Sequence, residues 1–227
     1  MTLRYAIYFT PPADDPLTVA ASRWLGRDAF SGKEPVEKAP EIADADLVGD
    51  PRRYGFHATL KAPFELHEER EEGALLDAFA SFAAKAKPFM IPKLVLGQLG
   101  PFFALVPGAL YPELQHFAAE IVRHFSPYRA PLSEADIARR KPETLGESHR
   151  RNLMQWGYPH VMGDFRFHMT LTGPVGPERS PEIRTVLEDY FADHVDRPLP
   201  ISGLALFVEE TRGAPFTVHS WLPLGSA

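Results

Sequence analysis

The chain has 227 residues, of which 44% are hydrophobic and 24% charged, as is usual for a soluble globular protein with a sizeable core. It contains no cysteine, which excludes disulfides, thiolate catalysis and cysteine-based zinc sites. No apolar run reaches the length of a membrane span, and the formal net charge of −6 argues against a protein that binds long nucleic acids through its overall charge.

The first predicted element is a strand at residues 4–10, in which Tyr5, Ile7 and Phe9 share one face. This pattern differs from the charged and then apolar pattern of a signal peptide. We therefore expect a cytoplasmic protein.

A helix is predicted next, because Asp15 is a good N-terminal cap, Pro16 suits the first helical position and Gly26 suits the end. Residues 27–50 are rich in Gly, Pro, Asp and Glu, and predict a long loop with at most one turn of helix. This loop leads into the first motif described below, so it is either a lid over a site or a plain linker.

One nine-residue motif occurs twice: residues 56–64 read FHATLKAPF, and residues 167–175 read FHMTLTGPV. Each copy is rich in strand-forming residues and ends near a proline, which predicts a short strand. Because strand side chains alternate, each copy presents one apolar face and one face with histidine and threonine. The residues on the second face are His57 and Thr59 in the first copy, and His168, Thr170 and Thr172 in the second.

The segments that follow the two copies also match. Each copy is followed by a helix, a strand, a turn and a strand at nearly equal spacing. The predicted ranges are 68–87, 89–96, 97–101 and 102–106 after the first copy, and 181–194, 200–209, 211–215 and 216–223 after the second. A repeat of this length predicts one domain, residues 1–227, with two lobes related by a pseudo-twofold axis. The lobes are expected around residues 53–107 and 165–223.

Two further helical regions lie between the repeats. Residues 111–125 have apolar side chains at helical spacing. Residues 133–157 have no counterpart in the other half and predict a helical insertion that leads to the second motif.

The chain resembles the 2H phosphoesterase superfamily, which is named for two H-x-[ST]-x motifs. The sequences that carry this resemblance are RYGFHATLK at residues 53–61 and FRFHMTLTG at residues 165–173. They look most like a bacterial branch associated with phosphonate-utilisation genes. The resemblance implies an α+β fold, with two lobes of antiparallel sheet plus helices around a central cleft. It also implies phosphoester chemistry without fixing the substrate.

The motif residues suit the opening of a cyclic phosphodiester. His57 and His168 can act as general base and general acid near neutral pH, and Thr59 and Thr170 can donate hydrogen bonds to phosphoryl oxygens. No carboxylate adjoins either motif, so we expect no metal and no other cofactor. The predicted reaction is metal-independent phosphodiester hydrolysis, with ligation as its reverse. Which histidine is the acid stays open.

Six further residues are candidates for substrate binding, each with a structural alternative. Arg53 and Arg166 either contact phosphate or pair with surface carboxylates, and Lys61 either borders the cleft or is a solvated residue at the end of a strand. Aromatic rings either stack on a base or sugar or belong to the core. These aromatic candidates are Tyr54 and Tyr158, and Thr172 completes the set because it shares the face of His168.

Four functions compete. A small cyclic phosphate or nucleotide-derived phosphodiester is the favoured substrate, and the phosphonate association points to a phosphorylated ribose. The alternative enzyme acts on 2′,3′-cyclic ends of RNA, which needs a basic groove lined with aromatics. A binding module without turnover and a histidine-based metal site are the other two hypotheses. We expect no membrane partner, and the oligomeric state stays open.

Overall fold

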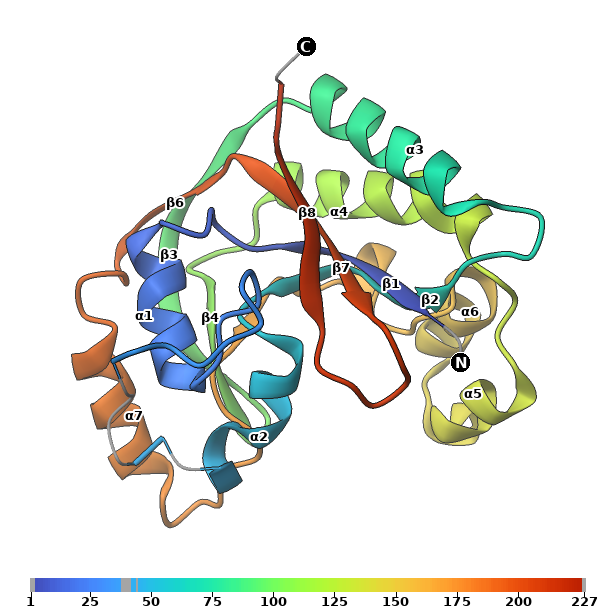
Figure 1. Cartoon of the computed structure of the whole chain (residues 1–227). Helices are drawn as coiled ribbons and strands as arrows, with labels where there is room; N and C mark the ends of the chain where they lie inside the picture. The colour runs from blue at the N-terminus through green and yellow to red at the C-terminus, as the bar shows by residue number, and fades with distance from the viewer. Residues whose placement is uncertain (1–2, 38–41, 44, 226–227) are drawn as a thin grey trace.

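The computed structural model describes residues 3–37, 42–43 and 45–225, and in this part of the chain the strands form an antiparallel sheet of eight. Their order is β6-β3-β4-β5-β2-β1-β7-β8 (Figure 1). The strands are β1 Arg4–Phe9, β2 Ala58–Glu65, β3 Phe89–Leu99, β4 Phe102–Pro107, β5 Met169–Thr170, β6 Arg197–Ile201, β7 Gly203–Glu209 and β8 Thr217–Pro223. With the helices described below, this sheet confirms the expected α+β class.

The strands of the two motifs are neighbours at the centre of the sheet, where β2 pairs with β5. Strands β1, β7 and β8 follow on the β2 side, and β4, β3 and β6 follow on the β5 side. Each side therefore holds four strands, as expected for a pseudo-twofold axis that passes between the two motifs.

The two halves of the sequence exchange strands across this axis. The hairpin β3–β4 comes from the first repeat, yet it pairs with β5 of the second motif, and β7 of the second repeat pairs with β1. The ranges 53–107 and 165–223 therefore do not correspond to two separate half-sheets. The order of elements is as predicted in the first repeat, whereas the second repeat has one strand more than predicted, and each half-sheet is built from both repeats.

The sheet is strongly curled. Strands β6 and β7 are the first and seventh strands in the order, yet Ser202 alone lies between them in the chain. One residue can span only a few ångströms, so the sheet must bend until these strands meet. The continuous strand expected at residues 200–209 is in fact these two strands, which pair with β3 and β1 respectively.

Most helices pack on the face of the sheet that holds the large core, and two helical regions, residues 45–54 and 134–156, also reach the cavity on the other face. Figure 1 shows α3 beside α4, and their contact includes the Phe82 and Phe117 rings, whose centroids are 6.1 Å apart. The helices are α1 Pro16–Leu25, α2 Ala45–Tyr54, α3 Glu72–Lys85, α4 Pro112–Phe125, α5 Glu134–Arg139, α6 Glu147–Trp156 and α7 Ser180–Tyr190. Short 3-10 turns occupy Ser126–Tyr128, Pro142–Thr144 and Met162–Asp164. Residues 133–157, where the sequence predicts a helical insertion, contain α5 and α6.

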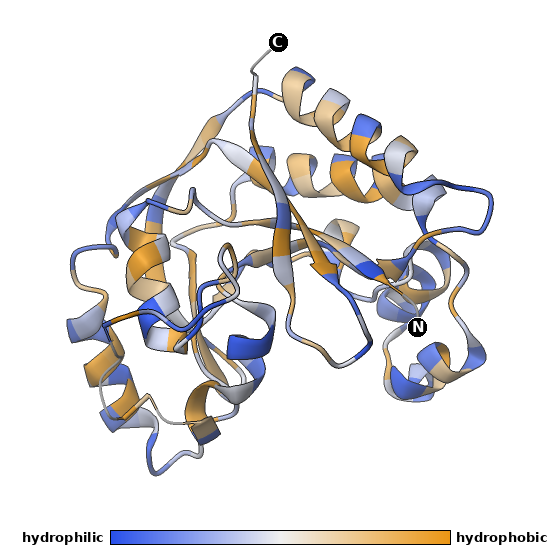
Figure 2. Cartoon of the chain, in the orientation of Figure 1, coloured by the Kyte–Doolittle hydropathy of each residue, from blue (hydrophilic) through white to orange (hydrophobic). Residues whose placement is uncertain are grey.

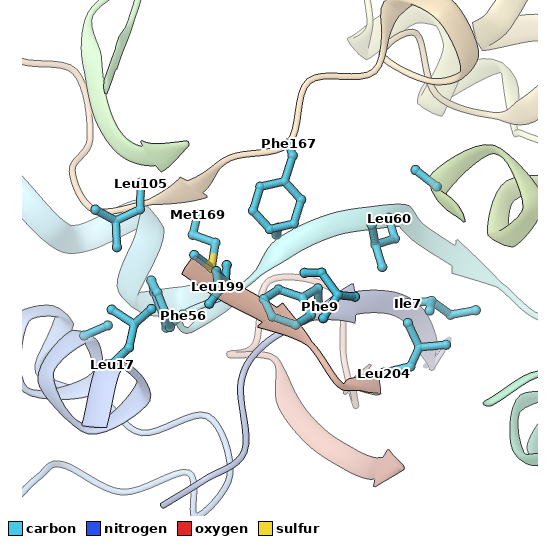
Figure 3. Packing of buried hydrophobic residues seen from close by; sticks show 14 of the residues in the cluster. Ile7, Phe9, Leu17, Phe56, Leu60, Leu105, Phe167, Met169, Leu199 and Leu204 are labelled. Atoms are coloured by element: carbon cyan, nitrogen blue, oxygen red, sulfur yellow. The ribbon is translucent and has the colours of Figure 1, made fainter. Parts of the chain in front are cut away.

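The alternation of β1 separates two cores. Tyr5, Ile7 and Phe9 belong to the large core between the sheet and the helices, whereas Ala6 and Tyr8 belong to a small cluster on the other face. Hydrophobic residues gather in the strands and hydrophilic ones in the connecting loops (Figure 2). Figure 3 shows Phe9 and Phe167 together in the large core, with ring centroids 5.8 Å apart. The apolar faces of the two motifs are therefore buried, as predicted.

The first helix follows its sequence signals. The Asp15 side chain accepts a hydrogen bond from Leu17 N at 2.8 Å, and Gly26 ends α1 in the left-handed conformation, with φ of 68°. The Asp15 carboxylate satisfies one free backbone amide at the start of the helix. Gly26 ends the helix because glycine adopts positive φ at little cost.

The sequence predicts a loop with at most one turn of helix at residues 27–50, but the helix at their C-terminal end is longer than that, since α2 begins at Ala45 and runs to Tyr54. Gly49 and Pro51 disfavour a helix locally, but tertiary contacts outweigh this preference. Leu47 and Val48 are buried, and Gly173 N donates to Leu47 O at 2.6 Å. Residues 38–41 and 44 of this segment, which the sequence leaves open as either a lid or a plain linker, lie outside the described residues.

Candidate active site

The two motifs meet in register. Ala58 is paired with Met169 in the antiparallel ladder between β2 and β5. Extending this register by one residue in each direction places His57 opposite Thr170 and Thr59 opposite His168. Residues opposite each other on antiparallel strands have Cβ atoms about 4.5–5.5 Å apart, and diagonal neighbours about 7–8 Å apart. Four polar side chains therefore share one face of the two central strands, with the histidines on a diagonal.

His57 is held in one orientation by three contacts. Its Nδ1 lies 2.8 Å from Gly55 O, its Nε2 lies 3.2 Å from Thr59 Oγ1, and its ring stacks on Tyr8 with centroids 3.9 Å apart. A neutral imidazole that donates its Nδ1 proton to a carbonyl has an Nε2 lone pair available to accept a proton. Gly55 has φ of 76°, and a Cβ there would lie 2.5 Å from Ala29 Cβ, so this carbonyl position requires glycine.

His168 repeats this arrangement. Its Nδ1 lies 2.7 Å from Arg166 O, the carbonyl two residues earlier, and its ring centroid lies 5.9 Å from that of Phe102. In both motifs the backbone two residues before the histidine therefore binds Nδ1. Both rings have the same tautomer and leave Nε2 for chemistry.

Both histidines favour the neutral form. The pKa of His57 is lowered to about 4, chiefly by burial and to a smaller extent by the nearby charge of His168, while the hydrogen bond to Gly55 O acts in the opposite direction. Burial also lowers the pKa of His168. The influence of His168 on the pKa of His57 agrees with the diagonal placement that the register gives.

A cavity of about 340 Å³ adjoins the motif residues on this face. It is lined by side chains from both motifs, from α2 and from the inserted helical region. The lining is Tyr8, Asp50, Pro51, Tyr54, Gly55, His57, Thr59, Ala62, Pro63, Phe102, Arg140, Tyr158, Thr170, Thr172, Gly173 and Pro174. His168 is not part of this lining. Its ring packs near the ring of Phe102, which does line the cavity.

Three of the predicted substrate-binding residues line this cavity. Tyr54 and Tyr158 bring aromatic rings from α2 and from the segment after α6. The hydroxyl of Thr172 is already used, since it accepts from Phe103 N at 3.0 Å and donates to Gly173 O at 2.8 Å. Thr172 therefore shapes the cavity and fixes β4, and has no spare donor for a substrate.

Lys61 does not border the cavity, contrary to the expectation from alternation. Tyr8 pairs with Thr59 but Ile7 pairs with Lys61, so β2 contains a bulge between these two pairs. The extra residue turns Lys61 to the face covered by helices. There it is only 3% exposed, and its Nζ lies 3.3 Å from Ser126 Oγ and 3.5 Å from Val122 O.

The two arginines before the motifs are not part of the cavity lining, although the Arg53 guanidinium lies over the Tyr54 ring, 4.9 Å from its centroid. Arg53 forms an ion pair with the buried carboxylate of Glu209 and donates from Nε to Ala214 O at 3.2 Å. Arg166 donates to Phe165 O at 2.9 Å and borders a different, shallow cavity beside Leu99 and Tyr111. Arg53 thus pairs with a carboxylate, as in its structural alternative, although this carboxylate is buried and not at the surface, and Arg166 contacts backbone carbonyls.

Among the lining residues that sequence reasoning missed are Tyr8, Asp50, Phe102 and Arg140. The alternation of side chains along β1 places Tyr8 on the face opposite Tyr5, Ile7 and Phe9. Its pairing with Thr59 depends on the register of β1 and β2, which the sequence does not show. Arg140 belongs to the basic cluster at residues 139–141, so its charge is visible in the sequence. The sequence does not show that its guanidinium lies over the Tyr158 ring, 4.8 Å from the centroid.

In residues 3–37, 42–43 and 45–225, no three histidine, aspartate or glutamate side chains are grouped in a way that could hold a metal ion. Over the same residues, every helix is too short or too polar to cross a lipid bilayer.

An antiparallel α+β fold with two His-x-Thr motifs on neighbouring central strands is the arrangement expected of a 2H phosphoesterase. The family model described as "Protein of unknown function (DUF1045)" matches residues 59–217. The chain belongs to this DUF1045 family.

Two curated proteins resemble the chain over most of its length. They are "Ribose 1,5-bisphosphate phosphokinase PhnN" of Janthinobacterium sp. (strain Marseille), 39% identical over 229 residues, and the protein of the same name from Laribacter hongkongensis (strain HLHK9), 33% identical over 219 residues. The matches cover 97% and 94% of this chain but 50% of each relative. The chain thus spans about half the length of these relatives.

Solved structures with similar folds include E. coli LigT complexed with NADP+, a phosphoesterase, and TT0787 of Thermus thermophilus. The sequence identities are 13%, 15% and 19%, and the TM-scores are 0.47, 0.45 and 0.44. Each match covers 99% of this chain and 98% or more of the other.

Proposed function

We propose that the chain is a metal-independent phosphodiesterase that opens a small cyclic phosphate with two histidines as general acid and base. One observation supports this proposal: Ala58 pairs with Met169 between β2 and β5, and this register, extended by one residue each way, predicts His57 beside Thr170 and Thr59 beside His168. In both motifs, Nδ1 lies within hydrogen-bond distance of the carbonyl two residues earlier. Two Nε2 atoms and two hydroxyls can then surround one phosphoryl group.

His57 is assigned as the base, because its lowered pKa keeps it neutral and able to accept a proton. A water oxygen attacks phosphorus while His57 Nε2 takes its proton. The phosphorus–oxygen bond of the ring breaks, and Nε2–H of protonated His168 gives its proton to the departing alkoxide. The products are a phosphate monoester and a free hydroxyl.

Thr59 and Thr170 donate hydrogen bonds to the non-bridging oxygens, which gain negative charge in the transition state. A bound phosphodiester anion also raises the pKa of the adjacent His168 through its charge. This allows the acid to be protonated in the complex, although burial lowers its pKa in the free protein.

The cavity supports a small substrate. Its volume of about 340 Å³ is at the lower end for small-molecule sites, and Tyr8, Tyr54, Phe102 and Tyr158 offer flat apolar surfaces for a sugar or base. The related proteins are named for ribose 1,5-bisphosphate. Opening a cyclic phosphate that joins C1 and C2 of ribose 5-phosphate, at its bond to O2, would yield that bisphosphate. A cyclic phosphate of a phosphorylated ribose, in phosphonate metabolism, is therefore the favoured substrate.

The test is a panel of cyclic phosphates followed by phosphorus NMR, with and without EDTA. The panel contains ribose 1,2-cyclic phosphate, nucleoside 2′,3′-cyclic phosphates, and the 5-phosphorylated form of each. We expect steady conversion of at least one compound to a monoester, unchanged by EDTA. Loss of turnover with EDTA would favour a metal enzyme, and no turnover of any compound would favour a binding module.

The second candidate is an enzyme for 2′,3′-cyclic ends of RNA. The four aromatic rings of the cavity and the neighbouring Arg140 favour it, because single-stranded nucleic acids bind by stacking and by phosphate contacts. Comparing adenosine 2′,3′-cyclic phosphate with oligonucleotides that end in the same group separates the two candidates. A kcat/KM that rises with oligonucleotide length supports the RNA enzyme.

A further inference from the structure

A second cavity, of about 110 Å³, adjoins the candidate active site. The two cavities share Pro63 and Arg140 in their linings. Strand β2 continues from one into the other, with Ala62 in the first lining and Phe64 and Glu65 in the second. The smaller cavity is therefore an extension of the proposed substrate site along β2.

The described lining of this second cavity is rich in arginine. It contains Arg4, Arg129, Arg139, Arg140 and Arg212, with the carboxylates of Glu65 and Asp136. Three of these arginines have carboxylate partners: Arg4 pairs with Glu209, Arg139 with Asp136, and Arg212 with both Asp136 and Glu65. Within the described residues, Arg129 and Arg140 form no ion pair. Positive charge therefore exceeds negative charge around the cavity.

Arg129 also has an unused hydrogen-bond donor. Its Nη1 donates to Ala130 O at 2.6 Å, but its Nε is buried without an acceptor in the described part of the chain. A buried donor without an acceptor is costly, and burial lowers the pKa of this guanidinium. Arg140 is held over the Tyr158 ring at the junction of the two cavities. Two guanidinium groups without counter-ions thus face the same small space.

We propose that this cavity is an anion subsite that binds a second phosphate group of the substrate, through Arg129 and Arg140. The inference rests on the proposed function, since the reacting phosphate is assigned to the histidine site. Arginine binds phosphate through paired, charge-assisted hydrogen bonds, which suits two guanidinium groups that form no ion pair within the described residues. The substrate class is a cyclic phosphate that carries a separate phosphate monoester.

The length of β2 sets the separation of the two sites. Four residues lead from Thr59 at the reacting end to Pro63 at the junction, or about 13 Å of extended strand. The bulge in β2 shortens this distance, and the long side chain of Arg140 reaches back from the junction. A single sugar unit between two phosphates fits this spacing better than two adjacent phosphates.

The experiment compares matched substrates. One pair is ribose 1,2-cyclic phosphate with and without a 5-phosphate, and the other is adenosine 2′,3′-cyclic phosphate with and without a 5′-phosphate. In Arg129→Gln, kcat/KM for the phosphorylated member should fall about 10- to 100-fold, as expected for a lost hydrogen bond between charged groups. The unphosphorylated member should change by less than about threefold, because Arg129 does not line the catalytic cavity.

Two further variants complete the design. Arg140→Gln should show the same preference, with some loss for both substrates because Arg140 lines both cavities. Arg123→Gln makes the same charge change at an exposed position on α4 and should leave both substrates unaffected. Circular dichroism of each variant establishes that it is folded.

Equal losses for both members of a pair, or no loss in Arg129→Gln, would overturn the subsite. If the wild type opens no cyclic phosphate, the proposed function fails, and the subsite is tested by binding alone. Inorganic phosphate is then titrated into His57→Ala and into His57→Ala with Arg129→Gln. Weaker binding in the second protein supports the subsite, and equal binding overturns it.

Discussion

Two histidines, held alike by the backbone, give the candidate site its chemistry. His57→Ala and His168→Ala should each lower turnover by about 10²–10⁴, the usual contribution of one general acid or base. The double variant should lose less than the product of the two single losses, because the residues act as one unit. Steady-state kinetics on a confirmed substrate measure this. Wild-type rates in both folded single variants would show that the duplicated motif is architectural.

The pH dependence follows from the direction of the pKa shifts. With His57 as base and a pKa of about 4, kcat/KM should rise as pH increases through about 4. With His168 as acid and its pKa lowered from 6.5, kcat/KM should fall again as pH rises past that lowered value. The optimum of kcat/KM is therefore acidic, and both limbs belong to the coupled pair.

The fall in kcat should occur at a higher pH than the fall in kcat/KM, because bound phosphate stabilises protonated His168. Rate measurements from pH 3.5 to about 9, with stability checked at each pH, decide the matter. A kcat/KM that still increases between pH 7 and 9 contradicts the assignment of the two roles.

Lys61 illustrates how burial on the helical face affects stability. Burial lowers its pKa from 10.5 to about 7. Between these values the unfolded chain binds a proton that the folded chain does not, so the free energy of unfolding should fall as pH drops from about 10.5 to 7 and then level off. Lys61→Met removes this effect and should raise the free energy of unfolding at pH 7 by about 1–4 kcal/mol.

Urea unfolding at pH 7 and pH 10 measures this change, with Lys85→Met on α3 as a matched control for the loss of one lysine. The Lys61 variant should lose part of the pH dependence that the wild type and the control share. Parallel pH dependence in all three proteins would show that Lys61 is solvated, contrary to its 3% exposure.

At the scale of elements, the buried end of β7 joins four parts of the fold. The Glu209 side chain is 0% exposed, pairs with Arg4 of β1 and Arg53 of α2, and accepts from Gly213 N at 2.9 Å. Glu209→Gln leaves two arginines without a buried counter-charge and should lower the free energy of unfolding by about 3–5 kcal/mol. Denaturant unfolding measures the effect.

Glu210→Gln is the matched control, because this neighbouring side chain is exposed and its replacement should change stability little. Equal stability of the two variants would mean that the Glu209 network contributes nothing net.

The backbone carbonyl of Arg53 also accepts from Phe216 N, so the same network fixes the segment just before His57.

The elements differ in how far the sequence predicts them. The motif strands, α1, α3, α4 and α7 have strong local signals of periodicity, caps and prolines, and the sequence predicts their existence with boundary errors of a few residues. It misses the helix α2 and the break at Ser202, because both depend on contacts with distant segments. The orientation of Lys61 fails for a related reason, since a β-bulge is a property of a strand pair and not of one strand.

The candidate site residues also divide into those that a local sequence signal identifies and those that depend on contacts with distant segments. The duplication points to His57, Thr59, His168 and Thr170, and the register brings them to one face. Tyr8 and Arg140 lack a repeat or a motif, so only their position in the fold identifies them. The ion pair of Arg53 is invisible in the sequence, because Glu209 is 156 positions away.

For the whole molecule, the exchange of strands between the repeats predicts a single unfolding unit. Neither half-sheet can form from one repeat alone, since β4 pairs with β5 and β1 pairs with β7. Urea unfolding followed by far-UV circular dichroism and by tryptophan fluorescence should therefore give coincident transitions. Separate transitions, with one lobe surviving the other, would indicate two independent domains.

The pairing of Ala58 with Met169 also has a consequence for how the protein acquires activity. The two histidines are roughly 110 residues apart in the sequence, and contacts between such distant segments form late and slowly. Helices and the β3–β4 hairpin can form from local contacts long before β5 closes on β2. A refolding chain would then regain most of its secondary structure before its catalytic pair exists, so that the appearance of activity marks the completion of the central sheet.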